Sequence, residues 1–400
     1  MRRFALAVLS VGVIVGMPAC LWPSLDGMSG GSGPPPLPTD LPTSGSLPPD
    51  APPLRVIATD TTASALVDNA FRVDFAAKTS WEPNGLASVK AGLDVTDLAA
   101  PWLSVVAFGF CSTTTGICSA TSILDNNQPT PKTTMVRHQT DARMTLEATW
   151  SRNYYGKDVH ATERFTVFPS GRMHVSFVVA TAPAYGIVST TLEYGRLQMP
   201  AATPWIPFTV ASAAALSDEA RMNVLVAAPT TQGVSPATQI VAATPTTPAS
   251  VLLQETKVNP VLGITREFDV VVGTSGETPA IVQAARVRSL TVDGDGSWGA
   301  LGFYDSATGM YSVSAKAQAA RIGLHLSGRS PGVRIGAWSA SIYTVSVDGT
   351  PIATSTHPST QKAVTAIDTD GALEIALAGD FDGSEVIEVL AVDAANKSGR

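Results

Sequence analysis

The chain has 400 residues, of which 44% are hydrophobic and only 15% are charged. Average soluble domains carry about 25% charged residues, so much of the polar surface must come from uncharged side chains, as is common in exported β proteins. The formal net charge is -7, and the sequence contains no cluster of lysine and arginine. This balance makes the protein a poor binder of a phosphate backbone and excludes nucleic acid as an expected partner.

The first residues form the pattern of an export signal. Arg2 and Arg3 give a positive start, and residues 4–17 form an apolar run without a charge. The run is shorter than the about 20 residues that a membrane-spanning helix needs, but it suits the apolar part of a signal peptide. We therefore expect residues 1–19 to be a signal peptide and the mature protein to be exported.

Cys20 is the candidate residue for a lipid anchor. The preceding residues Met17, Pro18 and Ala19 resemble the lipobox of bacterial lipoproteins, in which the cysteine sulfur takes a diacylglycerol and the new amine is acylated, for example with palmitate. Pro18 departs from that pattern, which leaves a plain secreted protein as the alternative. An ordinary signal-peptide cut before Cys20 would place Met17 at the third position before the cut. That position prefers a small residue, so bulky Met17 fits this alternative poorly. We expect a lipoprotein held at the cell membrane or at an outer membrane through Cys20.

The other cysteines support this interpretation, because an odd number of cysteines in an exported protein leaves one thiol unpaired. The stretch CSTTTGIC, from Cys111 to Cys118, is typical of a short loop closed by a disulfide, which forms readily outside the cytoplasm. Metal binding is the alternative, but two cysteines without a nearby histidine or third cysteine make a weak zinc site. We expect a Cys111–Cys118 disulfide, which leaves Cys20 for the lipid.

Residues 20–54 have the composition of a tether. They are rich in glycine, serine and proline. Such a segment buries too little apolar surface to order itself, and its proline-rich part should be extended while its glycine-rich part is flexible. We expect a disordered N-terminal tether that holds the rest of the chain off a membrane surface.

The remaining sequence predicts an all-β fold. Between Arg143 and Ala180, apolar and polar residues alternate in three runs, separated by a loop at residues 151–160 and a turn at residues 169–171. Period-two alternation interrupted by turns predicts an antiparallel meander. Further strand-like runs lie at residues 70–75, 103–110, 222–228, 266–273, 309–317, 321–328, 342–354, 372–379 and 385–392. Two stretches could form short helices, residues 211–222 and 278–286.

The spacing of strands and turns predicts two β-sandwich domains after the tether. We expect a large domain at residues 55–285 and a C-terminal domain of jelly-roll or immunoglobulin-like type at residues 290–400. Within the second domain, the Asp-Gly pair of residues 347–351 predicts a tight hairpin turn.

Two familiar motifs match without the context that their chemistry needs. GDGSWG, residues 294–299, satisfies the glycine pattern of dinucleotide-binding proteins, but strand and turn signals follow it where that site needs the start of a helix. GRSPG, residues 328–332, satisfies the pattern of a serine nucleophile, but Pro331 lacks the backbone N–H that would help to form an oxyanion hole. We therefore expect Ser330 to be a turn residue.

Three Asp-x-Asp pairs raise the question of calcium, which binds oxygen ligands at such spacings. The pairs are Asp293/Asp295, Asp368/Asp370 and Asp380/Asp382. Glycine follows each pair, and Asp-Gly is also common turn chemistry. We expect turns and no cofactor, with a calcium site as the alternative.

The candidate ligand-binding residues gather around one predicted hairpin: Arg152, Tyr154, Tyr155, His160 and Arg164. Such side chains hold a sugar by stacking and hydrogen bonds, and they could also remove a proton beside a uronate carboxylate, as in polysaccharide lyases. A polar hairpin loop without a ligand is the third interpretation. The histidines form no catalytic or metal-binding motif, so no catalytic residue and no metal ligand are assigned.

The stretches Phe165–Arg172 and Leu192–Pro200 resemble hairpins of the galactose-mutarotase-like β-supersandwich. The resemblance implies that fold and a role with carbohydrate, but it places the catalytic histidine and glutamate of mutarotases on no residue here. We expect a surface-tethered lipoprotein with a non-enzymatic role in envelope attachment or carbohydrate binding, whose partner is a glycan or an envelope protein. The alternative is a polysaccharide lyase or glycoside hydrolase that acts outside the cell.

Overall fold

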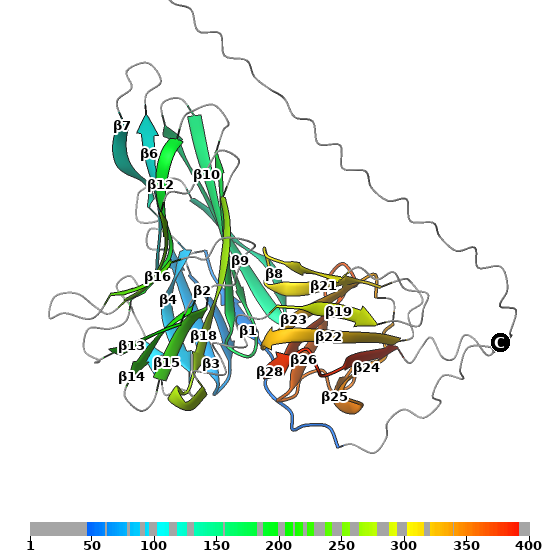
Figure 1. The fold of residues 1–400 in the computed structure, drawn as a ribbon. Helices are drawn as coiled ribbons and strands as arrows, with labels where there is room; N and C mark the ends of the chain where they lie inside the picture. Colours follow the sequence, from blue (N-terminus) through cyan, green and yellow to red (C-terminus); the bar gives the residue numbers. More distant parts are fainter. Residues whose placement is uncertain are drawn as a thin grey trace, which may run out of the picture. The chain divides into compact units, whose positions relative to one another are not determined.

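The computed structural model describes residues 46–391 apart from short internal stretches, and Ser44–Arg400 form one compact unit (Figure 1). The stretches left out are 61, 78–80, 89–92, 96–101, 112–117, 126–131, 155–156, 182–186, 199–204, 211–212, 219–221, 228–236, 242–249, 257–263, 278–287, 294–301, 316–320 and 339. The predicted signal peptide, Cys20, most of the predicted tether and the predicted helix at residues 278–286 therefore lie outside the described residues.

The described residues lie almost entirely in strands and turns, with a single short 3-10 helix at Ser275–Glu277, so the all-β prediction is confirmed. In this part of the chain, no helix has the length and apolar character needed to cross a membrane.

The described residues before position 280 form three sheets. A five-stranded antiparallel sheet has the order β1 (Arg55–Ala58), β2 (Thr62–Val67), β3 (Phe71–Ala77), β4 (Trp81–Ser88), β5 (Leu93–Val95). An eight-stranded sheet has the order β13 (Trp205–Val210), β14 (Ala213–Asp218), β15 (Met222–Ala227), β18 (Ile264–Gly273), β11 (Met173–Thr181), β10 (Lys157–Val167), β9 (Arg143–Tyr154), β8 (Lys132–Thr140). A second five-stranded sheet has the order β16 (Ala237–Val241), β17 (Ser250–Thr256), β12 (Ile187–Gln198), β6 (Trp102–Cys111), β7 (Cys118–Asp125).

Two further sheets form the C-terminal sandwich. The first has the order β19 (Leu290–Asp293), β22 (Arg321–Arg329), β29 (Ile387–Ala391), β24 (Tyr343–Val347), β25 (Thr350–Thr354), with β28 (Asp380–Asp382) paired to β22. The second has the order β20 (Gly302–Asp305), β21 (Met310–Ser314), β23 (Gly332–Gly336), β27 (Leu373–Leu377), β26 (Ala363–Ile367). The pair β21–β23 is parallel, which requires a crossover connection, here through β22.

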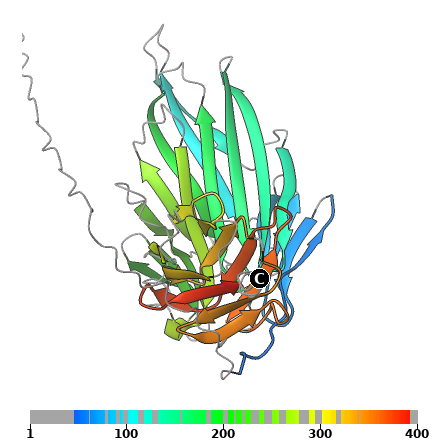
Figure 2. The ribbon, with the colours of Figure 1, turned by 90° about the vertical axis from the view of Figure 1, so that its right-hand side faces the viewer.

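The predicted meander is confirmed by β9, β10 and β11, which pair in sequence as antiparallel neighbours. The turn after β10 contains Gly171 at a φ of +83°, and the backbone N–H of Gly171 donates to the carbonyl of Phe168. Figure 2 shows these long strands from the side, in cyan to green. The Asp348-Gly349 turn between β24 and β25 is confirmed as well, with both residues at positive φ, as a two-residue hairpin turn requires.

Two local predictions are wrong. Residues 211–222 do not form a helix: β14 occupies Ala213–Asp218 and β15 begins at Met222. Strand β14 pairs with β13 on one side and β15 on the other, and these two ladders override the helix preference of its alanines. The predicted loop at residues 151–160 is mostly strand, because β9 runs to Tyr154 and β10 starts at Lys157.

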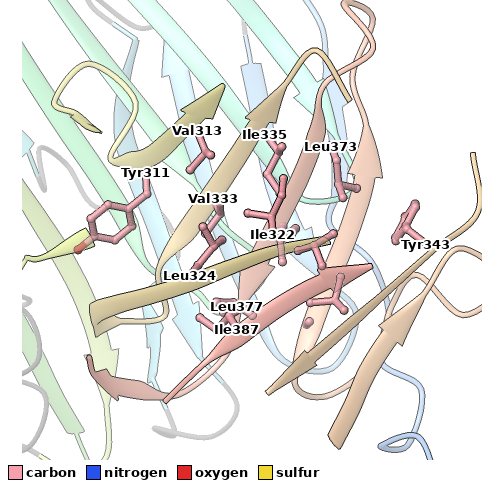
Figure 3. Packing of buried hydrophobic residues seen from close by; sticks show 14 of the residues in the cluster. Tyr311, Val313, Ile322, Leu324, Val333, Ile335, Tyr343, Leu373, Leu377 and Ile387 are labelled. Atoms are coloured by element: carbon pink, nitrogen blue, oxygen red, sulfur yellow. The ribbon is translucent and has the colours of Figure 1, made fainter. Parts of the chain in front are cut away.

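The C-terminal sandwich closes on a continuous apolar core (Figure 3). Leu324 of β22 and Ile387 of β29 come from one sheet, and Val333 of β23 and Leu373 of β27 come from the other; all four are fully buried. Alternating positions along each strand supply these residues, as the period of two predicts. Burial of one such side chain contributes about 1.5–3 kcal/mol.

The eight-stranded sheet has one apolar face. Its buried side chains include Leu146, Phe165 and Phe177, none of which is exposed. Phe165 packs on Phe75 of the first sheet, with ring centroids 5.5 Å apart. The same strands carry polar residues at the alternate positions, which lie on the opposite face.

The chain enters this fold through a strap, residues 49–54. The Pro49 carbonyl accepts from the N–H of Gln361, and the carbonyl of Ala51 accepts from the Ser359 hydroxyl at 2.6 Å. The N–H of Leu54 donates to the carbonyl of Asp141, between β8 and β9. The strap is thus bonded to the C-terminal sandwich at its start and to the eight-stranded sheet at its end.

Candidate anion-binding cleft

Polar residues are in register across five strands of the eight-stranded sheet. His138 pairs with Thr145, Thr145 with Thr166, Thr166 with His174, and His174 with Asp269. Paired residues of neighbouring strands point to the same face. A neighbouring row on this face runs through Glu147, Arg164, Ser176 and Glu267. The face is therefore rich in titratable groups.

An open cleft of about 440 Å³ lies at the β8–β9–β10 end of this polar face. Three arginines, a histidine, a glutamate, two threonines and an alanine line it: Arg137, His138, Arg143, Thr145, Glu147, Arg164, Ala307 and Thr308. We call it the arginine cleft. The last two residues belong to the turn between β20 and β21, so both halves of the fold contribute to the lining.

Glu147 accepts hydrogen bonds from two arginines at once. Nε of Arg137 donates to Oε1 at 2.8 Å, and Nε of Arg164 donates to Oε2 at 2.6 Å. Burial raises the pKa of Glu147, but the bonds from Arg164 and Arg137 outweigh burial and lower it, so the carboxylate stays ionised. The side chain of Glu147 is 7% exposed, against 51% for Arg137 and 34% for Arg164. The shared carboxylate is thus at the floor, and its guanidinium partners reach solvent.

Glu374 of β27 lies beneath the same end of the cleft. Its Oε1 accepts from Nε of Arg143 at 2.8 Å, and its Oε2 accepts from the Thr140 hydroxyl at 2.8 Å. The same Oε2 lies 3.0 Å from Nε2 of His138. Burial raises the pKa of Glu374, but His138 and Arg143 outweigh burial and lower it to about 2. Glu374 does not line the cleft itself, but its contacts orient Arg143 and His138, which do.

The ion pairs of the cleft are unbalanced. Three guanidinium groups, from Arg137, Arg143 and Arg164, share two carboxylates, from Glu147 and Glu374, while the Asp305 carboxylate accepts from the Thr308 hydroxyl. The two most exposed guanidinium groups, of Arg137 and Arg164, share the single carboxylate of Glu147. The cleft therefore suits an anionic ligand better than a cationic one.

The structure separates the residues predicted as a ligand site. Arg164 lines the arginine cleft. His160 is exposed on the same strand and pairs with Ser151, whereas Arg152 pairs with Val159 and Tyr154 with Lys157. His160 and Arg164 are separated by an even number of positions and so share the polar face. Tyr155 lies outside the described residues.

Sequence reasoning missed most of the cleft, namely Arg137, His138, Arg143, Glu147 and Glu374. A signal for part of it was present, because Arg143 and Glu147 alternate with apolar residues in β9 and must share a face. Glu374 gave no such signal, because its role depends on the contact between two sheets distant in sequence.

The predicted disulfide stays a prediction. Cys111 ends β6, Cys118 begins β7, and the two residues are paired in register. The loop between them lies outside the described residues.

The Asp368/Asp370 pair takes part in a turn, whereas Asp293 ends β19 and Asp380 and Asp382 lie in β28. Oδ1 of Asp368 accepts from the N–H groups of Asp370 and Ala372, and its Oδ2 accepts from Arg334. Ser330 lies between β22 and β23 at a φ of +47°, as expected of a turn residue. Asp295 lies outside the described residues, among which no group of three or more metal-ligating side chains gathers.

No protein-family model and no curated protein matches the chain. Several solved structures are similar. Heparan sulfate lyase HepC from Pedobacter heparinus is 9% identical with a TM-score of 0.37, over 68% of this chain and 41% of that one. Galactose 1-epimerase from Lactobacillus acidophilus NCFM is 7% identical with a TM-score of 0.36, over 55% of this chain and 98% of that one. A heparinase III gene product is 9% identical with a TM-score of 0.35, over 69% of this chain and 40% of that one.

The chain thus spans about two fifths of the length of the lyase chains that it matches. The expected resemblance to galactose-mutarotase-like proteins holds as a weak structural likeness.

Proposed function

We propose that the protein is an exported, surface-tethered lipoprotein that binds acidic carbohydrate in the arginine cleft without transforming it. The observation that carries the proposal is that two partly exposed guanidinium groups, of Arg137 and Arg164, share the single carboxylate of Glu147. Guanidinium groups pair with carboxylate and sulfate in charge-assisted, often bidentate hydrogen bonds. An acidic sugar supplies the second anion that this pair of arginines lacks.

The shape of the site supports an extended ligand. The cleft is open and has a volume of about 440 Å³, within the usual range of ligand sites. The polar face continues from the cleft along β9 and β10 to the exposed residues Ser151 and His160. The four-residue step from Arg164 to His160 spans about 13 Å, so the face has room for more than one sugar ring.

Titration calorimetry of the purified protein with neutral, uronate-containing and sulfated oligosaccharides tests the proposal. We expect binding of the acidic oligosaccharides only, with lower affinity at higher salt because screening weakens exposed charge pairs. Arg137→Gln should weaken binding by about tenfold or more, since a hydrogen bond to a charged group contributes about 1.5–3 kcal/mol.

Arg321→Gln is the matched control. Arg321 is 52% exposed and pairs with Glu388 outside the cleft, while Arg137 is 51% exposed and pairs with Glu147 inside it. Both substitutions remove one positive charge from an equally exposed arginine. An equal loss of affinity in both variants, or no binding of any acidic oligosaccharide, contradicts the proposal.

His138 favours a second candidate function, an eliminative lyase. Its ring is 20% exposed in the cleft, and Nε2 lies 3.0 Å from the buried carboxylate of Glu374. A histidine oriented by a carboxylate suits a general base. It would take the proton beside a uronate carboxylate; the electron pair left behind would form a C=C bond and expel the glycosidic oxygen, which takes a proton from water.

Product analysis separates the two candidates. Long incubation of the protein with uronate-containing polymers should leave them intact if the cleft only binds. Unsaturated chain ends that appear with the unaltered protein and disappear with His138→Gln would establish the lyase instead.

The lipid anchor needs its own test. Cys20→Ala should release the protein from the membrane fraction or block its maturation, because the acylated sulfur is absent. Unchanged membrane retention of the variant would contradict the anchor and leave the cleft proposal intact.

A further inference from the structure

The turn between β20 and β21 carries residues of the C-terminal sandwich into the arginine cleft. In this turn, the Asp305 carboxylate accepts from the N–H of Ala307 at 2.9 Å and from the hydroxyl of Thr308 at 2.7 Å. The N–H of Gly309 donates to the Asp305 carbonyl at 2.8 Å. Because the Thr308 hydroxyl hydrogen already has an acceptor, its oxygen has lone pairs to offer to a ligand in the cleft.

A buried group of charged residues, which we call the seam network, holds this turn against the eight-stranded sheet. Its members are Arg172, His174, Glu267, Asp269 and Arg288. His174 is fully buried, and its Nε2 donates to the carbonyl of Ser306 at 2.8 Å. Arg172 donates to the carbonyl of Gly309 through Nη2 and to that of Ser330 through Nη1. Both ends of the turn are therefore fixed from the polar face.

His174 faces an acceptor on each ring nitrogen. Nδ1 lies 2.9 Å from Oδ1 of Asp269, and Nε2 faces the Ser306 carbonyl, which cannot donate. Burial raises the pKa of Asp269, but Arg172, Arg288 and His174 outweigh burial and lower it, so the carboxylate accepts and does not donate. Each ring nitrogen of His174 therefore has an acceptor within hydrogen-bond distance.

Two further side chains lie close to the imidazole of His174. Oε2 of Glu267 lies 3.6 Å from Nε2 of His174, and Tyr304 of β20 approaches the imidazole edge-on at 6.3 Å between ring centroids. Nη2 of Arg288 donates to Oδ2 of Asp269 at 2.6 Å, while Oδ1 of the same carboxylate faces His174.

Gly309 is packed directly on this network. A Cβ at this position would lie 2.3 Å from Cγ of His174 and 2.8 Å from Nη2 of Arg172, closer than real contacts allow. Gly309 also has a φ of +70°, which disfavours other residues. The turn is thus fixed by steric fit as well as by hydrogen bonds.

We infer that the β20–β21 turn is a specificity wall of the arginine cleft, where Oγ1 of Thr308 accepts a hydrogen bond from a hydroxyl of the sugar whose acidic group is paired with the arginines. The inference rests on the proposed function and narrows its ligand class. A small inorganic anion can pair only with the arginines. A sugar that carries both an acidic group and a free hydroxyl can pair with the arginines and also donate a hydrogen bond to Thr308.

The direct test compares Thr308→Val and Thr308→Ser by titration with a sulfated, uronate-containing oligosaccharide and with inorganic sulfate. Thr308→Val keeps the shape but loses the hydroxyl, and should weaken oligosaccharide binding about fivefold while leaving sulfate binding unchanged. Thr308→Ser keeps a hydroxyl and should restore oligosaccharide binding. Thr344→Val, at another half-buried threonine of the same sandwich, is the control.

The position of the turn is tested by Gly309→Ala. Its control is Gly349→Ala, because Gly349 has a φ of +75° but a Cβ at this position would have nothing within 4 Å. Gly309→Ala should reduce oligosaccharide affinity more than inorganic sulfate affinity, whereas Gly349→Ala should change neither. If Gly309→Ala does not fold, the Thr308 variants still decide.

The failure of this inference differs from the failure of the proposed function. If Arg137→Gln loses oligosaccharide binding but Thr308→Val binds as the unaltered protein does, the arginine cleft stands and the specificity wall is wrong. If the unaltered protein binds no acidic oligosaccharide, both are wrong.

Discussion

The Arg143 guanidinium and the Glu374 carboxylate are bonded at 2.7–2.8 Å although the two residues are 231 positions apart. Arg143 is 6% exposed and Glu374 is fully buried. Glu374→Gln preserves the shape but leaves a buried guanidinium without a counter-charge. We expect it to lower the free energy of unfolding by about 3 kcal/mol, measured by urea denaturation.

The matched control is Glu388→Gln, which removes the carboxylate that pairs with the half-exposed Arg321. Because exposed ion pairs contribute about 0–1 kcal/mol, this variant should unfold close to the unaltered protein. Equal destabilisation of the two variants would show that the buried Arg143–Glu374 pair stabilises the protein no more than the exposed Arg321–Glu388 pair does.

Acid should weaken the same contact. The pKa of Glu374 is about 2 in the folded protein, below the ordinary glutamate value of 4.5. The stabilisation from ionised Glu374 is therefore complete above about pH 4.5 and is lost as the pH falls toward about 2, with a total on the order of 3 kcal/mol. Urea unfolding across this window should show a steeper loss for the unaltered protein than for Glu374→Gln. Parallel pH profiles of the two proteins would refute the assignment.

If the protein is exported, as we propose, Cys111 and Cys118 should form a disulfide. Their pairing in register brings the two backbones to neighbouring positions at the ends of β6 and β7. Peptide mass analysis after alkylation without reduction should recover the two cysteines in one cross-linked peptide. Recovery of both as alkylated thiols from protein isolated outside the cytoplasm would contradict the prediction.

The strands were predictable where one face is apolar and the other polar. In β11, Val175 and Phe177 alternate with His174 and Ser176, so the sequence indicates the strand and its two faces. It does not indicate that the polar face is covered, because His174 and Ser176 look like residues that face water but are buried. For His174, the contact with the Ser306 carbonyl of the C-terminal sandwich accounts for the burial.

The candidate site was harder to predict than the strands, for the same reason. Arg164 was identified as a ligand-binding residue, but its partner Glu147 lies on the neighbouring strand and Thr308 lies in the other half of the fold. A single sequence shows which residues share one face of a strand. It does not show which residues lie opposite each other on neighbouring strands, because the pairing register is unknown. The prediction of a polar loop at residues 151–160 was wrong because the polar residues up to Tyr154 and from Lys157 onward continue the β9–β10 ladder.

The strap, residues 49–54, has a mechanical consequence for a protein held by its N-terminus. A pulling force on the tether reaches Pro49 and Ala51 first, where the load passes to Ser359 and Gln361 of the C-terminal sandwich. In the proposed lipoprotein, these hydrogen bonds would have to break before tension reaches Leu54 and the β8–β9 turn beside the cleft. The strap would then protect the strands that form the arginine cleft from a force on the anchor.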